Sequence, residues 1–324
     1  DGITWDGSVV VTVSDVADLV NLVWARDSNG TEYVYLPNPL GDALKFTIAT
    51  VPVKTTIDGT VNANLPQKCQ FLLNYLDRLW AAGKTDQNKD RLYYSKILVP
   101  ETWDQTNNVI SFGGQFGERI TALSTFKDNM LLVGTDRSIY ILAVGTANNT
   151  LDWEQRVITR DYGILSNWTV VDTGDDVMFM DTYGDIRSLQ RTISEVSAGV
   201  KALPISQKIK DQLPYTASIH KSAAAYFNGL YFLFFATGAN TRKLFVYDKA
   251  IDSWVGGDWT FSYAGNAVHP FMGISTPVLG TITDPPSSFS QFFILARDTT
   301  GRLYALRIDD LDDISNHSAT MPSS

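Results

Sequence analysis

Cysteine is almost absent from this chain of 324 residues, with Cys69 as the single copy. One cysteine excludes an internal disulfide framework, and it favours synthesis in a reducing cytosol. Cys69 stands close to Phe71, Leu72 and Leu73. We therefore interpret it as a small core residue rather than a nucleophile.

Long apolar runs and basic clusters are missing as well. No run approaches the roughly 18 apolar residues that cross a bilayer, and no cationic, apolar signal segment opens the chain, so we predict no membrane insertion. Lysine and arginine number 26 against 35 acidic residues, which gives a formal charge of −9. Because phosphate contacts supply most of the affinity for nucleic acid, this balance argues against sequence-specific nucleic-acid binding. It is compatible with DNA passing through an acidic pore.

Known catalytic motifs are also absent. The three histidines, His220, His269 and His317, stand far apart, and none has a metal-ligand spacing such as HExxH. No GxSxG, P-loop or GxGxxG motif stands between a strand and a helix. We therefore predict that the chain is not an enzyme, has no catalytic residue and binds no cofactor.

One acidic cluster near the C-terminus is a weak candidate for a metal site. Carboxylate oxygens are the ligands that calcium takes, but the cluster lacks the spacing and the glycine of an EF-hand. A solvated acidic surface is the alternative interpretation. The cluster consists of Asp309, Asp310, Asp312 and Asp313.

Paired carboxylates would indicate a glycosidase, and three acids are candidates: Glu118, Asp161 and Asp181. Nothing in the sequence shows that two of them converge. Glu118 and Asp161 stand next to Arg119 and Arg160, so we interpret them as partners of these arginines.

Aromatic residues are abundant, at 12%, and hydrophobic residues make up 44% of the chain. This composition is typical of strands with half-buried faces. A polar turn, an apolar run, a second Asp/Gly/Asn turn and another apolar run recur along the chain, which is the pattern of hairpins. The second turns centre near positions 28, 87, 136, 183, 240 and 300.

Repeats of this length, each with about four strands, predict an all-β fold of β-propeller type with about six blades. We expect one propeller domain over 1–324 with a polar tail at 311–324. The blade units are expected near 6–45, 65–105, 108–150, 151–200, 217–262 and 268–310. Two β-sandwiches or a long meander would also give regular hairpins, and these alternatives stay open.

The segment 203–215 departs from the strand pattern. Ile205, Ile209 and Leu213 recur at every fourth position, and Pro204 and Pro214 flank them, so we predict one short inserted helix. A surface helix packed on the propeller and a helix that presents these three residues as an interface are both compatible with the stripe.

The apolar runs predict the core. Six residues in successive hairpins should be buried: Leu131, Ile139, Val177, Phe179, Phe232 and Phe245.

Several of these segments, in their order, resemble the propeller of tail and neck proteins of tailed bacteriophages. The resemblance covers roughly residues 70 to 255. Its motifs are Asn74–Trp80, Arg91–Ser95 with Pro100–Trp103, Glu118–Leu142, Tyr162–Leu189 and Tyr226–Trp254.

This resemblance implies a virion structural protein of the tail nozzle, tail tube or head-completion type. The chain would be made in the host cytoplasm and would form part of a ring of six copies around the DNA-ejection conduit. Its implied partners are a tail adaptor or portal-proximal protein and tail fibres. The alternative is a carbohydrate- or receptor-binding propeller of a tail or lectin type, in which aromatic rings stack on sugars. The candidate rings are Trp103, Trp168 and Trp259.

Overall fold

The computed structural model describes residues 21, 23–48, 53–113, 117–145, 152–200, 203–227, 229–238, 241–262, 273–277, 290–297 and 303–308, with side chains as far as Gly256. The chain divides into two compact units. The first is Asp1–Ile120 with Thr146–Asn148, and the second is Thr121–Gly145 with Asn149–Ser324.

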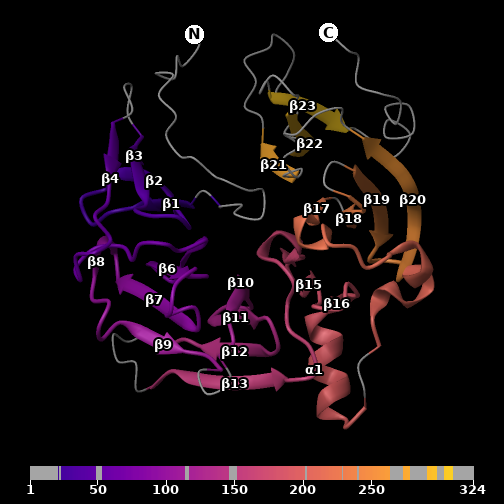
Figure 1. The fold of residues 1–324 in the computed structure, drawn as a ribbon, viewed down its shortest axis with the longest axis horizontal. Helices are drawn as coiled ribbons and strands as arrows, with labels where there is room; N and C mark the ends of the chain where they lie inside the picture. Colours follow the sequence, from indigo (N-terminus) through magenta and orange to yellow (C-terminus); the bar gives the residue numbers. More distant parts are fainter. Residues whose placement is uncertain are drawn as a thin grey trace. The chain divides into compact units, whose positions relative to one another are not determined.

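The first unit contains two antiparallel sheets made of strands that follow one another in the chain (Figure 1). The first sheet consists of β1 (Val23–Arg26), β2 (Glu32–Leu36), β3 (Leu44–Thr47) and β4 (Lys54–Thr56). The second consists of β5 (Phe71–Tyr75), β6 (Arg78–Ala82), β7 (Arg91–Lys96) and β8 (Val99–Trp103), with β9 (Val109–Ser111) paired to β7.

The second unit repeats this arrangement in four further sheets. The first has β10 (Ile120–Phe126), β11 (Met130–Thr135), β12 (Ile139–Ala143) and β13 (Glu154–Thr159), and the next has β14 (Val171–Asp172), β15 (Val177–Met180) and β16 (Ile186–Ser188). Then come β17 (Ala223–Phe227), β18 (Leu230–Ala236), β19 (Thr241–Asp248) and β20 (Ser253–Ser262), and finally β21 (Gly273–Pro277), β22 (Ser290–Arg297) and β23 (Leu303–Ile308).

Consecutive antiparallel strands in small separate sheets are the pattern of propeller blades, so the predicted all-β propeller class is confirmed. The number of blades that close the ring stays a prediction. The sheets overlap the predicted blade units, but β4, β9 and β13 lie beyond the predicted ends of units 6–45, 65–105 and 108–150.

A two-residue turn illustrates how the sequence builds these hairpins. Tyr75 pairs with Arg78 across β5 and β6, which leaves Leu76 and Asp77 in the turn. Both have positive φ, 51° and 57°. This is the primed turn whose twist matches that of the flanking strands.

The predicted core is confirmed. All six residues nominated from the apolar runs are buried, with Leu131, Ile139 and Phe179 fully so. Phe179 and Ile139 belong to one cluster that also contains Tyr162 and Leu189. Phe245 belongs to a second cluster, together with Tyr231.

The helices differ from the prediction in two ways. The α-helix α1 (Leu189–Ser197) was not predicted, because its first apolar residue continues the run of strand β16. The Ser188 side chain accepts a hydrogen bond from the Arg191 N–H and so caps its first turn. The segment predicted as a helix over 203–215 is a 3₁₀ helix over Ile205–Gln212, interrupted at Ile209. Two shorter 3₁₀ segments span Asn167–Thr169 and Ile219–Lys221.

No helix in the described part of the chain is long and apolar enough to span a membrane.

Candidate functional site

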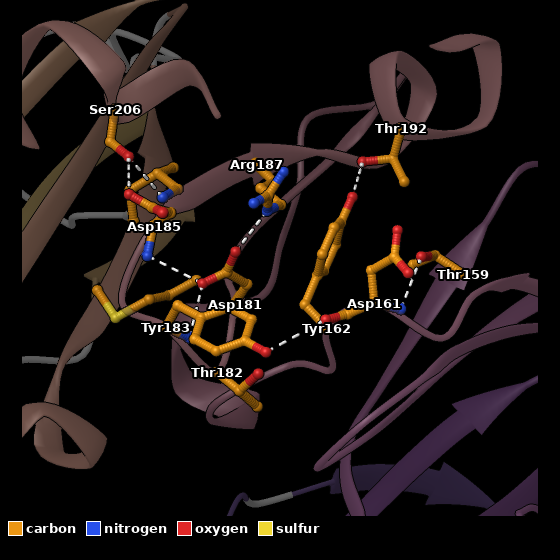
Figure 2. Close-up of polar contacts among 12 residues, drawn as sticks. Thr159, Asp161, Tyr162, Asp181, Thr182, Tyr183, Asp185, Arg187, Thr192 and Ser206 are labelled. Atoms are coloured by element: carbon orange, nitrogen blue, oxygen red, sulfur yellow. Dashed lines mark hydrogen bonds and ion pairs between the residues drawn. The ribbon is translucent and has the colours of Figure 1, made fainter. Parts of the chain in front are cut away.

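Asp181, one of the three acids considered as glycosidase candidates, lies fully buried at the turn between β15 and β16. Its Oδ1 accepts hydrogen bonds from the backbone N–H groups of Tyr183 at 2.8 Å and Asp185 at 3.0 Å. Its Oδ2 forms an ion pair with Nε of Arg187, as Figure 2 shows. Both oxygens are therefore engaged by the chain itself.

The Arg187 guanidinium is held on its other side by an aromatic ring. It lies 3.8 Å from the ring centroid of Tyr162, a cation–π contact in a buried setting. The Tyr162 hydroxyl in turn lies 3.2 Å from Thr192 Oγ1 on α1 (Figure 2). Burial raises the pKa of Asp181, and the Arg187 charge opposes this shift. The chain of contacts ties the β15–β16 turn to the helix, which is a structural role.

Asp185 and Asp176 extend this structural role to the neighbouring segments. Asp185 accepts from Ser206 Oγ at 3.3 Å and pairs with Lys210 Nζ at 3.2 Å. Asp176 accepts from the Gln190 N–H at 2.8 Å, in the first turn of α1. These carboxylates fasten the helical segments to the sheet.

The other two acids differ from Asp181 in their surroundings. Asp161 is exposed, and Glu118 is buried in the first unit. The Asp161 backbone carbonyl accepts a hydrogen bond from the Tyr183 hydroxyl at 3.4 Å, so Asp161 lies beside the β15–β16 turn. Asp181 is nevertheless not a free carboxylate, because Arg187 and two backbone N–H groups engage both of its oxygens.

Cys69 is buried, and burial raises the pKa of its thiol to about 12. This confirms its interpretation as a core residue, since the thiolate is the reactive form. His220 lies in the 3₁₀ segment Ile219–Lys221, whereas His269, His317 and the acidic cluster Asp309, Asp310, Asp312 and Asp313 lie outside the described residues. Within the described residues, no group of three or more His, Cys, Asp or Glu side chains could hold a metal ion.

The stripe nominated as an interface faces the core. Ile209 and Leu213 are buried and Ile205 is partly buried, all against the cluster that contains Tyr231 and Phe245. Trp254 Nε1 donates to the Ile205 carbonyl at 3.1 Å. This placement fits a helical segment packed on its own propeller.

A polar pocket of about 120 Å³ lies in the first unit, where the sheet β1–β4 meets β8 and the loop that follows β4. Its lining combines aromatic, aliphatic and charged groups: Tyr35, Lys45, Ile57, Asn64, Leu65, Pro100, Glu101 and Trp103. This volume is somewhat below that of a cavity of about 150 Å³ that holds one benzene ring.

Strand register brings the polar groups of this pocket together. Tyr35 on β2 is the direct cross-strand partner of Lys45 on β3, so both side chains lie on the same face of the sheet. Tyr33 lies two residues before Tyr35 and shares that face. Lys45 Nζ lies 4.9 Å from the Tyr33 ring centroid.

Glu101 on β8 supplies the carboxylate of the pocket. Its Oε1 accepts a hydrogen bond from the Tyr35 hydroxyl at 3.4 Å and forms an ion pair with Lys45. Burial raises the pKa of Tyr35, and the Glu101 charge adds to this shift. The phenol therefore stays a neutral donor. Side-chain exposures of 20% for Lys45 and 38% for Glu101 leave this pair within reach of a ligand.

The wall of the pocket is held by side-chain bonds to the backbone. Trp103 is buried, and its Nε1 donates to the Pro100 carbonyl at 2.8 Å. Gln105 Nε2 lies 3.0 to 3.1 Å from the carbonyl oxygens of Gly59, Val61 and Asn64, which share its two N–H donors. These bonds hold the loop after β4 against β8, so the pocket has a preformed wall.

Of the two nominated tryptophans whose side chains the structure describes, Trp103 lines the polar pocket. Its ring is a buried wall with its N–H already bonded. Trp168 is half-buried in the 3₁₀ segment Asn167–Thr169. Trp259 lies on β20 opposite Leu244, beyond the residues whose side chains the structure describes.

Sequence reasoning did not nominate Tyr35, Lys45 or Glu101. Tyr35 and Lys45 stand in no motif named above, and Glu101 stands in the phage-like segment Pro100–Trp103 without a predicted binding role. The three come from two strands of one sheet and one strand of another. The alternation of β2 could have placed Tyr33 and Tyr35 on one face, but nothing in the sequence pairs that face with β8.

A second pocket, of about 220 Å³, lies in the second unit beside α1. Its lining is mainly apolar: Phe126, Lys127, Met130, Ile141, Ala143, Glu154, Arg156, Ile158 and Ile193.

No protein-family model matches this chain, and no curated protein matches it. Among solved structures, BBS1N in complex with ARL6DN is similar with a TM-score of 0.51 at 9% identity, over 86% of this chain and 76% of that chain. SapL1 lectin in complex with alpha methyl fucoside gives a TM-score of 0.43 at 13% identity, over 90% and 97% of the two chains. The WD40 beta propeller domain of Doa1 gives 0.43 at 8%, over 90% and 93%. At these identities the likeness concerns the fold alone.

Proposed function

We propose that this chain is a carbohydrate-binding propeller and that the polar pocket formed by Tyr35, Lys45 and Glu101 is its recognition site. The observation that carries this proposal is the pocket itself. It presents a partly exposed carboxylate and ammonium group, with the buried Tyr35 phenol bonded to the carboxylate, beside apolar and aromatic walls. Small-molecule sites typically combine such walls with a few convergent polar groups.

Sugars match this lining chemically. Each hydroxyl both donates and accepts hydrogen bonds, so a carboxylate and an ammonium group together satisfy neighbouring hydroxyls. Hydrogen bonds to charged groups are stronger than neutral ones. The aliphatic C–H face of a sugar ring packs against apolar and aromatic surface.

Binding without turnover is part of the proposal. Asp181, one of the two buried acids among the glycosidase candidates, has both oxygens engaged by Arg187 and by backbone N–H groups. Glu101 in the pocket is paired with Lys45 rather than with a second carboxylate. A glycosidase needs two carboxylates about 5 to 10 Å apart across the scissile bond, and the pocket lining contains one.

A glycan array with the labelled full chain tests the function. We expect selective binding that is lost in Glu101→Gln. The matched control is Glu32→Gln, which removes the exposed Arg26–Glu32 ion pair on the sheet that carries Tyr35 and Lys45 and should leave binding unchanged. Binding to no glycan on the array would contradict the proposal, and release of free sugar from a bound glycan would contradict the absence of turnover.

The second candidate function is that of a ring component of the virion. This function is compatible with glycan binding if the propeller is part of a phage tail. It is supported by the order of the phage-like segments. They coincide with strands of four consecutive sheets, from β5 to β20. The net charge of −9 suits a conduit that must not retain DNA. Imaging of intact particles should then reveal several symmetry-related copies around the tail axis, and absence of the protein from purified virions would contradict this role.

A further inference from the structure

We infer that the pocket binds uncharged sugars in preference to anionic sugars. Its ligand is a terminal neutral pyranose that presents two adjacent hydroxyls to the pocket. This inference rests on the proposed function and concerns the ligand class of the same pocket. It follows from the way in which Lys45 and Glu101 are paired.

The first step concerns the unused hydrogen-bonding capacity of Glu101. Both of its contacts within the described residues, from Tyr35 and from Lys45, fall on Oε1. Oε2 is therefore available to accept from a ligand. Because two donors hold one oxygen of this carboxylate, the orientation of the second oxygen is fixed as well. A fixed acceptor favours a single position for the ligand hydroxyl that donates to it.

The second step concerns Lys45. An ammonium group has three N–H donors, and one of them serves Glu101. The group lies over the Tyr33 ring, 4.9 Å from its centroid, which fixes its position on the sheet. The remaining donors lie next to Glu101, so a free acceptor and a free donor stand side by side. Two adjacent hydroxyls, one donating and one accepting, fit this arrangement.

The third step concerns charge. Lys45 and Glu101 neutralise each other, and no further cation lines the pocket. A ligand carboxylate that approached Lys45 would also approach the Glu101 carboxylate that is paired with it. The two negative charges would repel each other. The site therefore disfavours glucuronate and sialate, and it accepts ligands whose polar groups are neutral.

The fourth step concerns size. A pocket of about 120 Å³ is somewhat smaller than a cavity of about 150 Å³ that holds one benzene ring, so it admits part of a single sugar ring. The rest of the ligand stays in solvent. A terminal residue fits this size best, because it is linked at one position and its other edges are free to enter the pocket.

Saturation-transfer NMR on the full chain tests this selectivity. The neutral probes are the methyl glycosides of galactose, mannose and fucose, and the anionic probes are methyl glucuronide and N-acetylneuraminic acid. We expect at least one neutral probe to bind more tightly than both anionic ones. Glu101→Gln should weaken neutral binding by roughly tenfold or more, because a charge-assisted hydrogen bond is lost. It should also shift the preference toward methyl glucuronide, because the Lys45 charge is then unbalanced.

Two controls separate the outcomes. Glu32→Gln should leave every affinity unchanged, and circular dichroism of each variant should match the wild type. Preferential wild-type binding of the anionic probes, or unchanged neutral binding in Glu101→Gln, would overturn this inference while leaving carbohydrate binding intact. Failure to bind any probe, together with a blank glycan array, would contradict the proposed function itself.

Discussion

The buried Asp181–Arg187 pair permits a quantitative test of the structural role assigned to it. In Arg187→Met, the Asp181 carboxylate keeps its two backbone N–H donors but loses its counter-charge in a site with no solvent exposure. Removing one partner of a buried ion pair costs about 3 to 5 kcal/mol, because the other charge stays buried and uncompensated. The Tyr162 ring also loses its cation–π partner.

The matched control is an exposed pair in the same unit. Arg191 and Asp252 lie 3.4 Å apart with side-chain exposures of 39% and 63%. Exposed pairs contribute about 0 to 1 kcal/mol, so Arg191→Met should change the free energy of unfolding by less than about 1 kcal/mol. Urea denaturation followed by tryptophan fluorescence compares the two variants directly.

The pH dependence provides a second readout. Burial raises the pKa of Asp181 in the folded protein above its ordinary value, and removing Arg187 raises it further. The folded state then binds this proton more readily than the unfolded state, so protonation favours folding. The free energy of unfolding of Arg187→Met should therefore move closer to that of the wild type as the pH falls from about 7 to about 5.

Two results would refute this reasoning. The first is equal destabilisation by Arg187→Met and Arg191→Met. The second is a difference in the free energy of unfolding between Arg187→Met and the wild type that widens as the pH falls.

Three further predictions concern the core, a close backbone approach and the thiol. Phe179→Ala should cost about 3 to 5 kcal/mol in urea denaturation, because Phe179 is fully buried, and a loss under about 1 kcal/mol would contradict its place in a packed sheet. Gly163→Ala should destabilise by about 1 to 3 kcal/mol, since a Cβ there would lie 2.0 Å from the Thr135 carbonyl oxygen. Gly41→Ala, whose Cβ would approach nothing closer than 3.5 Å, should be nearly neutral in the same assay. Cys69, whose thiol pKa is raised to about 12 by burial, should not react with a disulfide reagent at about pH 8 until urea unfolds the protein; fast labelling of the folded chain would show that the thiol is accessible.

Much of the fold could be predicted from the sequence because hairpins are local. Turn residues such as Asp128 and Asn129 and the apolar run after them define a hairpin without long-range information. The same runs identified buried residues such as Phe179 and Phe245, since a strand inside a packed sheet needs apolar side chains. The repetition of hairpins then led to the propeller class.

The helices were less predictable because one apolar run can serve two kinds of element. Ile186 is in strand β16 and Leu189 begins α1. The two residues between them, Arg187 and Ser188, include no glycine or proline that would mark the end of the strand. Only the tertiary contacts of Ser188, which caps the helix and also hydrogen-bonds to Asp176, decide where the strand ends. At Ile209, packing against the core interrupts the regular helix that the spacing predicted.

The recurring hairpins, the all-β class and the buried runs could be predicted from local sequence, because these depend on neighbours within a few residues. The tertiary structure alone decided that Asp181 is a structural ion-pair partner and that Tyr35, Lys45 and Glu101 share a pocket. Cross-strand register joins Tyr35 to Lys45, and the packing of one sheet against the next brings Glu101 to them. A site assembled in this way leaves no spacing in the sequence, because its members are brought together by packing and not by a shared turn or helix.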